Sequence, residues 1–141
     1  MITITQFDQA IQAIVDHIGA TDFVRAANDE HVTRRLADKS GDIVVASLPT
    51  FSQRGMSENP SEQHAAFLWI LSKPGADDTE QDERDNYERM QQLILQAKEF
   101  IREQQEDGCS IWWRLEVSSI IIEPEYNLWG GWNGWHMTLL F

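Results

Sequence analysis

Apolar residues recur at helical spacing in two stretches of the chain. A period of about 3.6 residues with one apolar side is typical of an amphipathic helix that buries one face. We expect Thr5 to cap the first helix and Gly19 to end it. The second helix should run from Tyr87 to about Asp107. The first apolar stripe consists of Phe7, Ile11, Ile14, Val15 and Ile18, and the second of Tyr87, Met90, Leu93, Ile94, Ala97, Phe100 and Ile101.

Three other stretches have the composition or the alternation of strands. Residues 42–52 are rich in Val and Ile, which favour strands, with Pro49 suggesting an edge or a bend. Residues 64–72 are apolar at both odd and even positions, which predicts a strand that is central or covered on both sides. In residues 111–117, apolar and polar side chains alternate, as they do in a half-buried strand. Extended chain then continues to Pro124.

The C-terminal stretch predicts a hairpin. Residues 126–129 lead into a run of Trp and Gly, and the chain then alternates apolar and polar positions from Trp135 to Phe141. Asn133-Gly134 is typical of a tight hairpin turn. We therefore expect two strands joined by a glycine-rich turn.

The remaining segments have the composition of connections. Residues 20–41 are mostly polar, with Val32 and Leu36 allowing a short helix, and residues 53–63 are loop-like. Residues 73–86 are acidic and predict a solvated connection, without the ligand spacing of a calcium loop. The order of elements predicts a single α+β domain over residues 1–141. Its mixed sheet should be mostly antiparallel, with two main amphipathic helices packed on one face.

Composition excludes several classes of partner. The 141 residues carry a net charge of −12, and no stretch has the clustered Lys and Arg that bind phosphates. No apolar run approaches the length of a membrane span, and no basic-then-apolar leader stands at the N-terminus. We expect no nucleic acid, no membrane and a cytoplasmic location. Cys109 is the only cysteine, so no intrachain disulfide is possible.

Candidate catalytic chemistry is sparse. The four histidines are scattered, without the spacing of a helical metal motif, and no nucleophile-elbow or phosphate-loop pattern occurs. Glu123 and Glu125 flank Pro124 and would share one face of an extended segment. Such a pair can act as acid and base in an apolar pocket, or it can simply flank an edge strand. We expect no catalytic residues, no metal and no cofactor.

The run Trp129-Gly-Gly-Trp132-Asn-Gly-Trp135 is the most unusual feature of the sequence. Its three rings can close the end of the core around a tight turn. They can instead anchor a protein interface, where Trp is enriched. A stacking platform for a sugar or a base is the third possibility.

The order of elements, with Tyr126-Asn127 and Asn133-Gly134-Trp135-His136-Met137 before the final strand, resembles small phage or prophage virion proteins of the tail-completion or tail-terminator kind. The resemblance implies a mixed sheet backed by helices, assembly into a ring at the end of a tail tube, and action through surfaces. This chain differs from that pattern in its long acidic connection at 73–86.

Two hypotheses follow for function. The first is a non-enzymatic structural or assembly protein, homo-oligomeric and bound to protein partners, which would be a virion component if phage-derived. The second is a small ligand-binding module or enzyme with a Trp-lined cleft near residues 123–135. Both place the interface or ligand residues in one segment: Glu123, Glu125, Tyr126, Trp129, Trp132 and Trp135.

Overall fold

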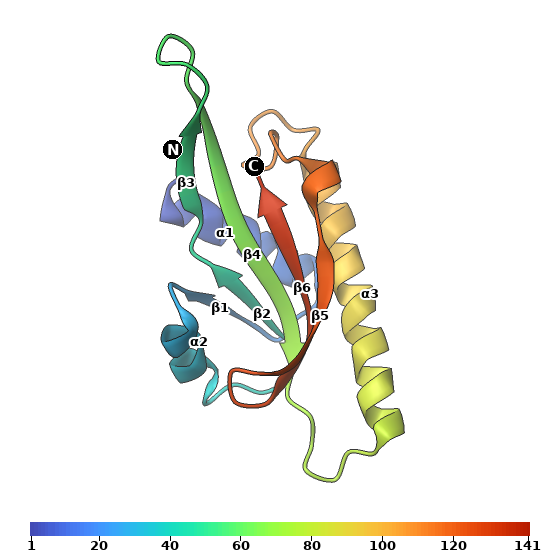
Figure 1. Ribbon diagram of the computed structural model, residues 1–141. Coiled ribbons are helices and arrows are strands. Elements are labelled where there is room, and N and C mark those ends of the chain that lie inside the picture. The colour runs from blue at the N-terminus through green and yellow to red at the C-terminus, as the bar shows by residue number, and fades with distance from the viewer.

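The computed structural model describes residues 1–141, which form three α-helices and a six-stranded mixed sheet (Figure 1). A 3₁₀ turn, η1 (Val117–Ser119), precedes the last two strands. The helices are α1 (Ile4–Ile18), α2 (Asp29–Leu36) and α3 (Glu80–Gln104). The strands are β1 (Asp22–Ala26), β2 (Ile43–Ser47), β3 (Thr50–Arg54), β4 (Ser61–Ser72), β5 (Ile122–Leu128) and β6 (Trp132–Leu140).

The strand order is β1-β2-β4-β6-β5, and β3 pairs with the first half of β4. Only β1 and β2 are parallel; the other pairs are antiparallel. The predicted α+β class and the mostly antiparallel mixed sheet are therefore confirmed. The strand that is apolar on both sides, β4, lies at the centre, as its composition predicts.

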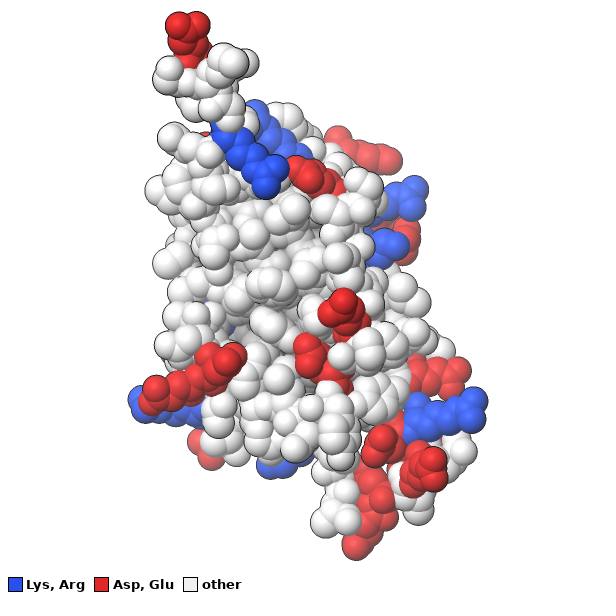
Figure 2. Space-filling view, in the orientation of Figure 1, with Lys and Arg blue, Asp and Glu red and all other residues white.

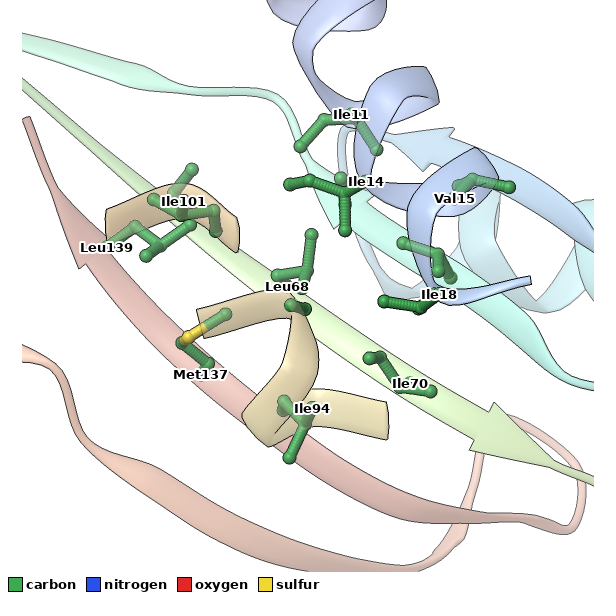
Figure 3. Packing of buried hydrophobic residues seen from close by; sticks show 14 of the residues in the cluster. Ile11, Ile14, Val15, Ile18, Leu68, Ile70, Ile94, Ile101, Met137 and Leu139 are labelled. Carbon is green, nitrogen blue, oxygen red and sulfur yellow. The ribbon is translucent and has the colours of Figure 1, made fainter. Parts of the chain in front are cut away.

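The main core lies between the sheet and the two long helices. Figure 3 shows side chains of α1 and α3 pointing toward the same face of β4 and β6. Both predicted apolar stripes supply this core, and each fully buried aliphatic side chain stabilises the fold by about 1.5–3 kcal/mol. The residues that meet there include Ile11, Ile14, Ile18, Leu68, Ile70, Ile94, Ile101, Met137 and Leu139.

The ends of the two helices depend on local hydrogen bonds. Thr3, and not the predicted Thr5, caps α1: the Gln6 N–H donates to the Thr3 hydroxyl oxygen, and the Gln6 side-chain oxygen accepts from the Thr3 N–H. Gly19 ends α1 in the left-handed conformation, as predicted. The helix α3 begins at Glu80, before its apolar stripe, because Thr79 and Asp82 form a reciprocal cap. Part of the expected acidic connection is thus helical.

The segment predicted as a connector, residues 20–41, contains both α2 and the unpredicted strand β1. Val32 and Leu36 of α2 pack against the other face of the sheet, at the end formed by β1 and β2. Trp132 at the start of β6 is buried in this second, smaller cluster. The two main helices thus share one face, and α2 covers one end of the opposite face.

Residues 111–117 do not form the predicted strand. The chain makes a series of turns after α3, and Leu115 N–H donates to the carbonyl of Trp112 (2.9 Å). This turn brings Trp112 and Leu115 into the main core while Trp113 stays half-exposed. Trp112 and Leu115 are therefore buried because they lie three apart on a turn, and the alternation of apolar and polar residues does not reflect a strand.

The predicted hairpin and its glycine-rich turn are present, but the turn lies at Gly130 and Gly131 and not at Asn133-Gly134. Residues 129–131 make the turn between β5 and β6, with positive φ angles of 48° at Trp129, 91° at Gly130 and 110° at Gly131. Asn133 and Gly134 belong to β6. Gly134 serves close packing, since a Cβ atom there would lie 2.0 Å from the carbonyl oxygen of Ile70. No helix of the chain is both long enough and apolar enough to cross a membrane.

Candidate functional site

The face of the sheet opposite α1 and α3 is left uncovered over β4, β6 and β5, beyond the end that α2 occupies. Two rows of side chains cross these strands in register. Ile121, Thr138 and Phe67 form one row, and Glu123, His136 and Trp69 form the next. We call these six residues, together with Glu125, the open sheet face.

The apolar part of the open sheet face is formed by aromatic and aliphatic side chains. Phe67 is 44% exposed although it lies in the central strand, and Ile121 is 54% exposed. The rings of Phe67 and Trp69 lie 5.8 Å apart, and the Trp129 ring meets Trp69 edge-on at 4.8 Å. These contacts form a continuous aromatic surface from the middle of β4 to the β5–β6 turn.

The polar part is a histidine between two carboxylates. His136 Nδ1 lies 2.8 Å from Glu125 Oε1, and His136 Nε2 lies 3.6 Å from Glu123 Oε2. The closer contact lacks the angle of a hydrogen bond, so Nδ1 is left without a directional partner. The His136 side chain is only 13% exposed, whereas that of Glu123 is 61% exposed. Glu123 therefore presents its charge to solvent on β5, one strand away from the aromatic rings of β4.

No Lys or Arg neutralises this carboxylate pair. The ion pairs that involve Lys and Arg all lie elsewhere on the molecule and engage other acids. Figure 2 shows the uncovered face of the sheet as mostly uncharged atoms, with acidic groups inside that area and basic groups at its rim. The open sheet face is thus apolar with a negative centre.

The structure separates the three predicted tryptophans. Trp129 borders the open sheet face, and its indole N–H donates to Asp29 Oδ1 of α2 (3.2 Å). Trp132 is buried beneath α2, only 2% exposed. Trp135 lies on the opposite side of the sheet, where its indole N–H donates to the carbonyl oxygen of Tyr87 (2.9 Å). The three rings do not line one cleft.

Of the other predicted residues, Glu123 and Glu125 lie on the open sheet face as expected for positions two apart. Tyr126 follows them on β5 and is one of the most exposed apolar side chains, at 71%. Sequence reasoning missed Phe67, Trp69 and His136. The apolar character of both faces of β4 was a signal for Phe67 and Trp69. The position of His136 beside them depends on the β4–β6 register, which the sequence does not specify.

The arrangement is suited to contact with a partner. No group of three or more His, Cys, Asp or Glu side chains is placed to hold a metal ion. A hollow of about 340 Å³ lies away from the Trp-rich turn, at the other end of β4, between the N-terminal residues, His64, Cys109 and Phe141. It contains none of the predicted site residues. An exposed aromatic surface that shares a sheet face with an unpaired carboxylate offers a partner both apolar contact and charge pairing.

No family model matches the sequence, and no curated protein matches it.

Proposed function

We propose that this protein is a non-enzymatic assembly component that works as an oligomer and binds another protein through its open sheet face. The observation that carries the proposal is Phe67, which is 44% exposed in the middle of the central strand. The solvated face of an antiparallel sheet ordinarily carries polar side chains, so an exposed Phe at its centre is unusual. A contiguous apolar area on a folded chain marks a surface for a partner.

The charge of the surface indicates the chemistry of that partner. Glu123 is solvent-exposed and lies in register with His136 and Trp69, with no basic side chain of its own chain paired to it. An Arg or Lys from a partner would pair with this carboxylate on β5, while apolar groups of the same partner pack on the rings of β4. The partner should therefore present an apolar surface that carries at least one Arg or Lys.

The kind of assembly is proposed from the sequence. Residues 126–141, which resemble phage tail-completion proteins, supply the end of β5, the turn at Trp129 and the whole of β6. These elements carry His136 and border Phe67 and Trp69. We therefore propose that the protein is a structural component of the tail-completion kind, with the open sheet face as a contact surface.

A ligand-binding function is less well supported. Its cleft required three tryptophans around one space, and two of them are directed to other parts of the molecule. What remains is Trp129 beside the carboxylate pair, which is also part of the surface proposed for a protein. We therefore favour a macromolecular partner.

Site-specific photocrosslinking tests this proposal. A photoreactive phenylalanine analogue at position 67, in the protein expressed in its own host, should crosslink to one defined protein. The control places the same analogue at Leu95 of α3, which has the same 44% exposure but lies outside the open sheet face. The crosslinked peptide of the partner, identified by mass spectrometry, should contain or adjoin an Arg or Lys.

Three results would overturn the proposed contact. The first is an equal set of crosslinks from positions 67 and 95, which would show a non-specific surface. The second is a crosslink only between two copies of this chain, which would make the face a self-interface. The third is that no protein crosslinks, whereas a small organic cation added to the protein shifts the fluorescence of Trp69 and Trp129. This result would favour the ligand-binding function.

A further inference from the structure

The strand β3 has an unpaired edge, and the hydrogen bonds of its neighbour show which of its groups are free. His64 on β4 exchanges two backbone hydrogen bonds with Phe141, at 2.6 and 2.9 Å. The backbone of His64 therefore faces β6. Because successive residues of a strand direct their N–H and C=O groups to opposite sides, Gln63 and Ala65 face β3.

The register then assigns the groups of β3. Thr50 pairs with Ala65 and Ser52 pairs with Gln63, so the backbones of Thr50 and Ser52 face β4. The Thr50 hydroxyl also donates to the carbonyl oxygen of Ala65 (3.3 Å). By alternation, the N–H and C=O groups of Phe51 and Gln53 point away from the sheet. Figure 1 shows the β3–β4 hairpin extending beyond the rest of the sheet.

The edge formed by β5 is protected against further pairing. Thr138 N–H donates to the carbonyl oxygen of Ile121, so Ile121 and Glu123 face β6 and Pro124 faces outward. Proline has no N–H to offer there.

The edge formed by β1 carries charges, which also discourage strand addition. Asp22 is paired with Lys39, and Arg25 is paired with Asp8. The N–H of Phe23 already donates to the Asp22 side chain (2.7 Å). In contrast, the sequence of β3, Thr-Phe-Ser-Gln-Arg, contains no proline and only one charge, and every residue of it is exposed.

We propose that β3 pairs in antiparallel fashion with β3 of a second copy, around a two-fold axis at Ser52. This register places Phe51 opposite Gln53 of the second copy, and Gln53 opposite Phe51 of the second copy. Both residues have outward-facing groups, so the pairing satisfies four backbone hydrogen bonds. In a register shifted by one residue, a residue whose backbone groups point outward would lie opposite one whose backbone groups point toward β4. The hydrogen bonds between the two copies could then not form.

The side chains are compatible with this register. Ser52 faces Ser52 of the second copy, and Arg54, the only charge on the strand, faces Thr50. No like charges lie directly opposite each other, which would be destabilising. The two-fold pairing is therefore self-complementary, which is the condition for a closed dimer contact. Since each copy carries a net charge of −12, association should strengthen as salt screens the repulsion.

Backbone amide exchange tests the inference, which rests on the oligomeric state in the proposed function. NMR-detected hydrogen exchange would be measured over a range of protein concentrations, with sedimentation velocity on the same samples. The amides of Phe51 and Gln53 should exchange fast in dilute protein and slow as association proceeds. The amide of Ser52, bonded to β4 in either state, should be protected at all concentrations.

Two substitutions of Ser52, at the two-fold axis, test the same contact without NMR resonance assignments. Ser52→Lys places two like charges opposite each other and should abolish the dimer, whereas Ser57→Lys in the hairpin loop adds the same charge and should not. In a Cys109→Ser background, Ser52→Cys should form an intermolecular disulfide on mild oxidation. Cα atoms at such a non-hydrogen-bonded pair lie about 4.5 Å apart, which a disulfide can span. Ser57→Cys is the matched control.

The outcomes separate this inference from the proposed function. Association with concentration-independent exchange at Phe51 and Gln53, or undiminished association of Ser52→Lys, would overturn the β3 contact and leave an oligomer built through another surface. A monomer at every concentration would overturn both the β3 contact and the oligomeric part of the proposed function.

Discussion

Tyr87 and Trp135 join the long helix to the C-terminal hairpin. The indole N–H of Trp135 donates to the carbonyl oxygen of Tyr87 (2.9 Å), and the two rings meet edge to face with centroids 6.4 Å apart. The Tyr87 hydroxyl in turn donates to the carbonyl oxygen of Glu125 (2.7 Å). These contacts hold β5 and β6 on α3 from behind, and so set the position of Glu123 and Glu125 on the open sheet face.

Loss of the Tyr87 hydroxyl should destabilise the fold. Tyr87→Phe keeps the ring contact with Trp135 but leaves the Glu125 carbonyl without that donor, which should cost about 1 kcal/mol in the free energy of unfolding. Urea denaturation followed by Trp fluorescence would measure it. The control is Tyr126→Phe, which removes an exposed hydroxyl and should change stability by less than about 0.5 kcal/mol. Equal effects of the two variants would contradict the role given to Tyr87.

The same tyrosine should make stability depend on alkaline pH. Burial, followed by the nearby charges of Glu83, Tyr126 and Glu125, raises the pKa of Tyr87 above its ordinary value. A pKa raised in the folded state means that the folded protein holds the proton more tightly. Its stabilising contribution is therefore complete below about pH 10, the ordinary tyrosine pKa, and is lost as pH rises through the folded value.

The chain has two tyrosines, so Tyr126→Phe leaves Tyr87 as the only one. Ultraviolet titration of the phenolate in this variant should give a midpoint above about 10 in the folded protein and near 10 in concentrated urea. A folded midpoint at or below the unfolded one would contradict the partly buried position of the Tyr87 hydroxyl.

Gly134 should be intolerant of any side chain. A Cβ atom at this position would meet the carbonyl oxygen of Ile70 at 2.0 Å and its carbonyl carbon at 3.0 Å. Since both atoms are backbone, β4 or β6 must shift, and Gly134→Ala should lower the free energy of unfolding by about 2 kcal/mol or more. Gly108→Ala is the control, because nothing lies within 4 Å of its Cβ. Similar stabilities of the two variants would contradict this packing.

Helical periodicity was the most reliable signal in the sequence. The stripe in α1 is buried as predicted, and in α3 Met90, Ile94, Ala97 and Ile101 are buried, because one side of each helix packs against the main core. The alternation at 111–117 misled because Trp112 and Leu115 reach the core from a turn. Asn133-Gly134 misled because the local preference for a turn is overridden by the close approach of Gly134 to β4.

The candidate site could be predicted only in part. Glu123 and Glu125 share a face because they are two apart on a strand, which is a local property. The contacts of His136 with these carboxylates depend on the β5–β6 register, and its contact with Trp69 depends on the β4–β6 register. Registers of this kind are fixed by the fit of the whole core, so Phe67, Trp69 and His136 could not be assigned to one surface from the sequence.

A charge reversal at Glu123 tests most directly whether the open sheet face binds a basic protein surface. The measurement is the yield of the position-67 photocrosslink in Glu123→Lys, compared with Glu99→Lys on α3, which makes the same charge change outside the open sheet face. We predict at least a tenfold loss of the crosslink in Glu123→Lys, equivalent to about 1.4 kcal/mol of binding free energy, and no loss in Glu99→Lys. An undiminished crosslink in Glu123→Lys, or an equal loss in both variants, would contradict the proposed contact.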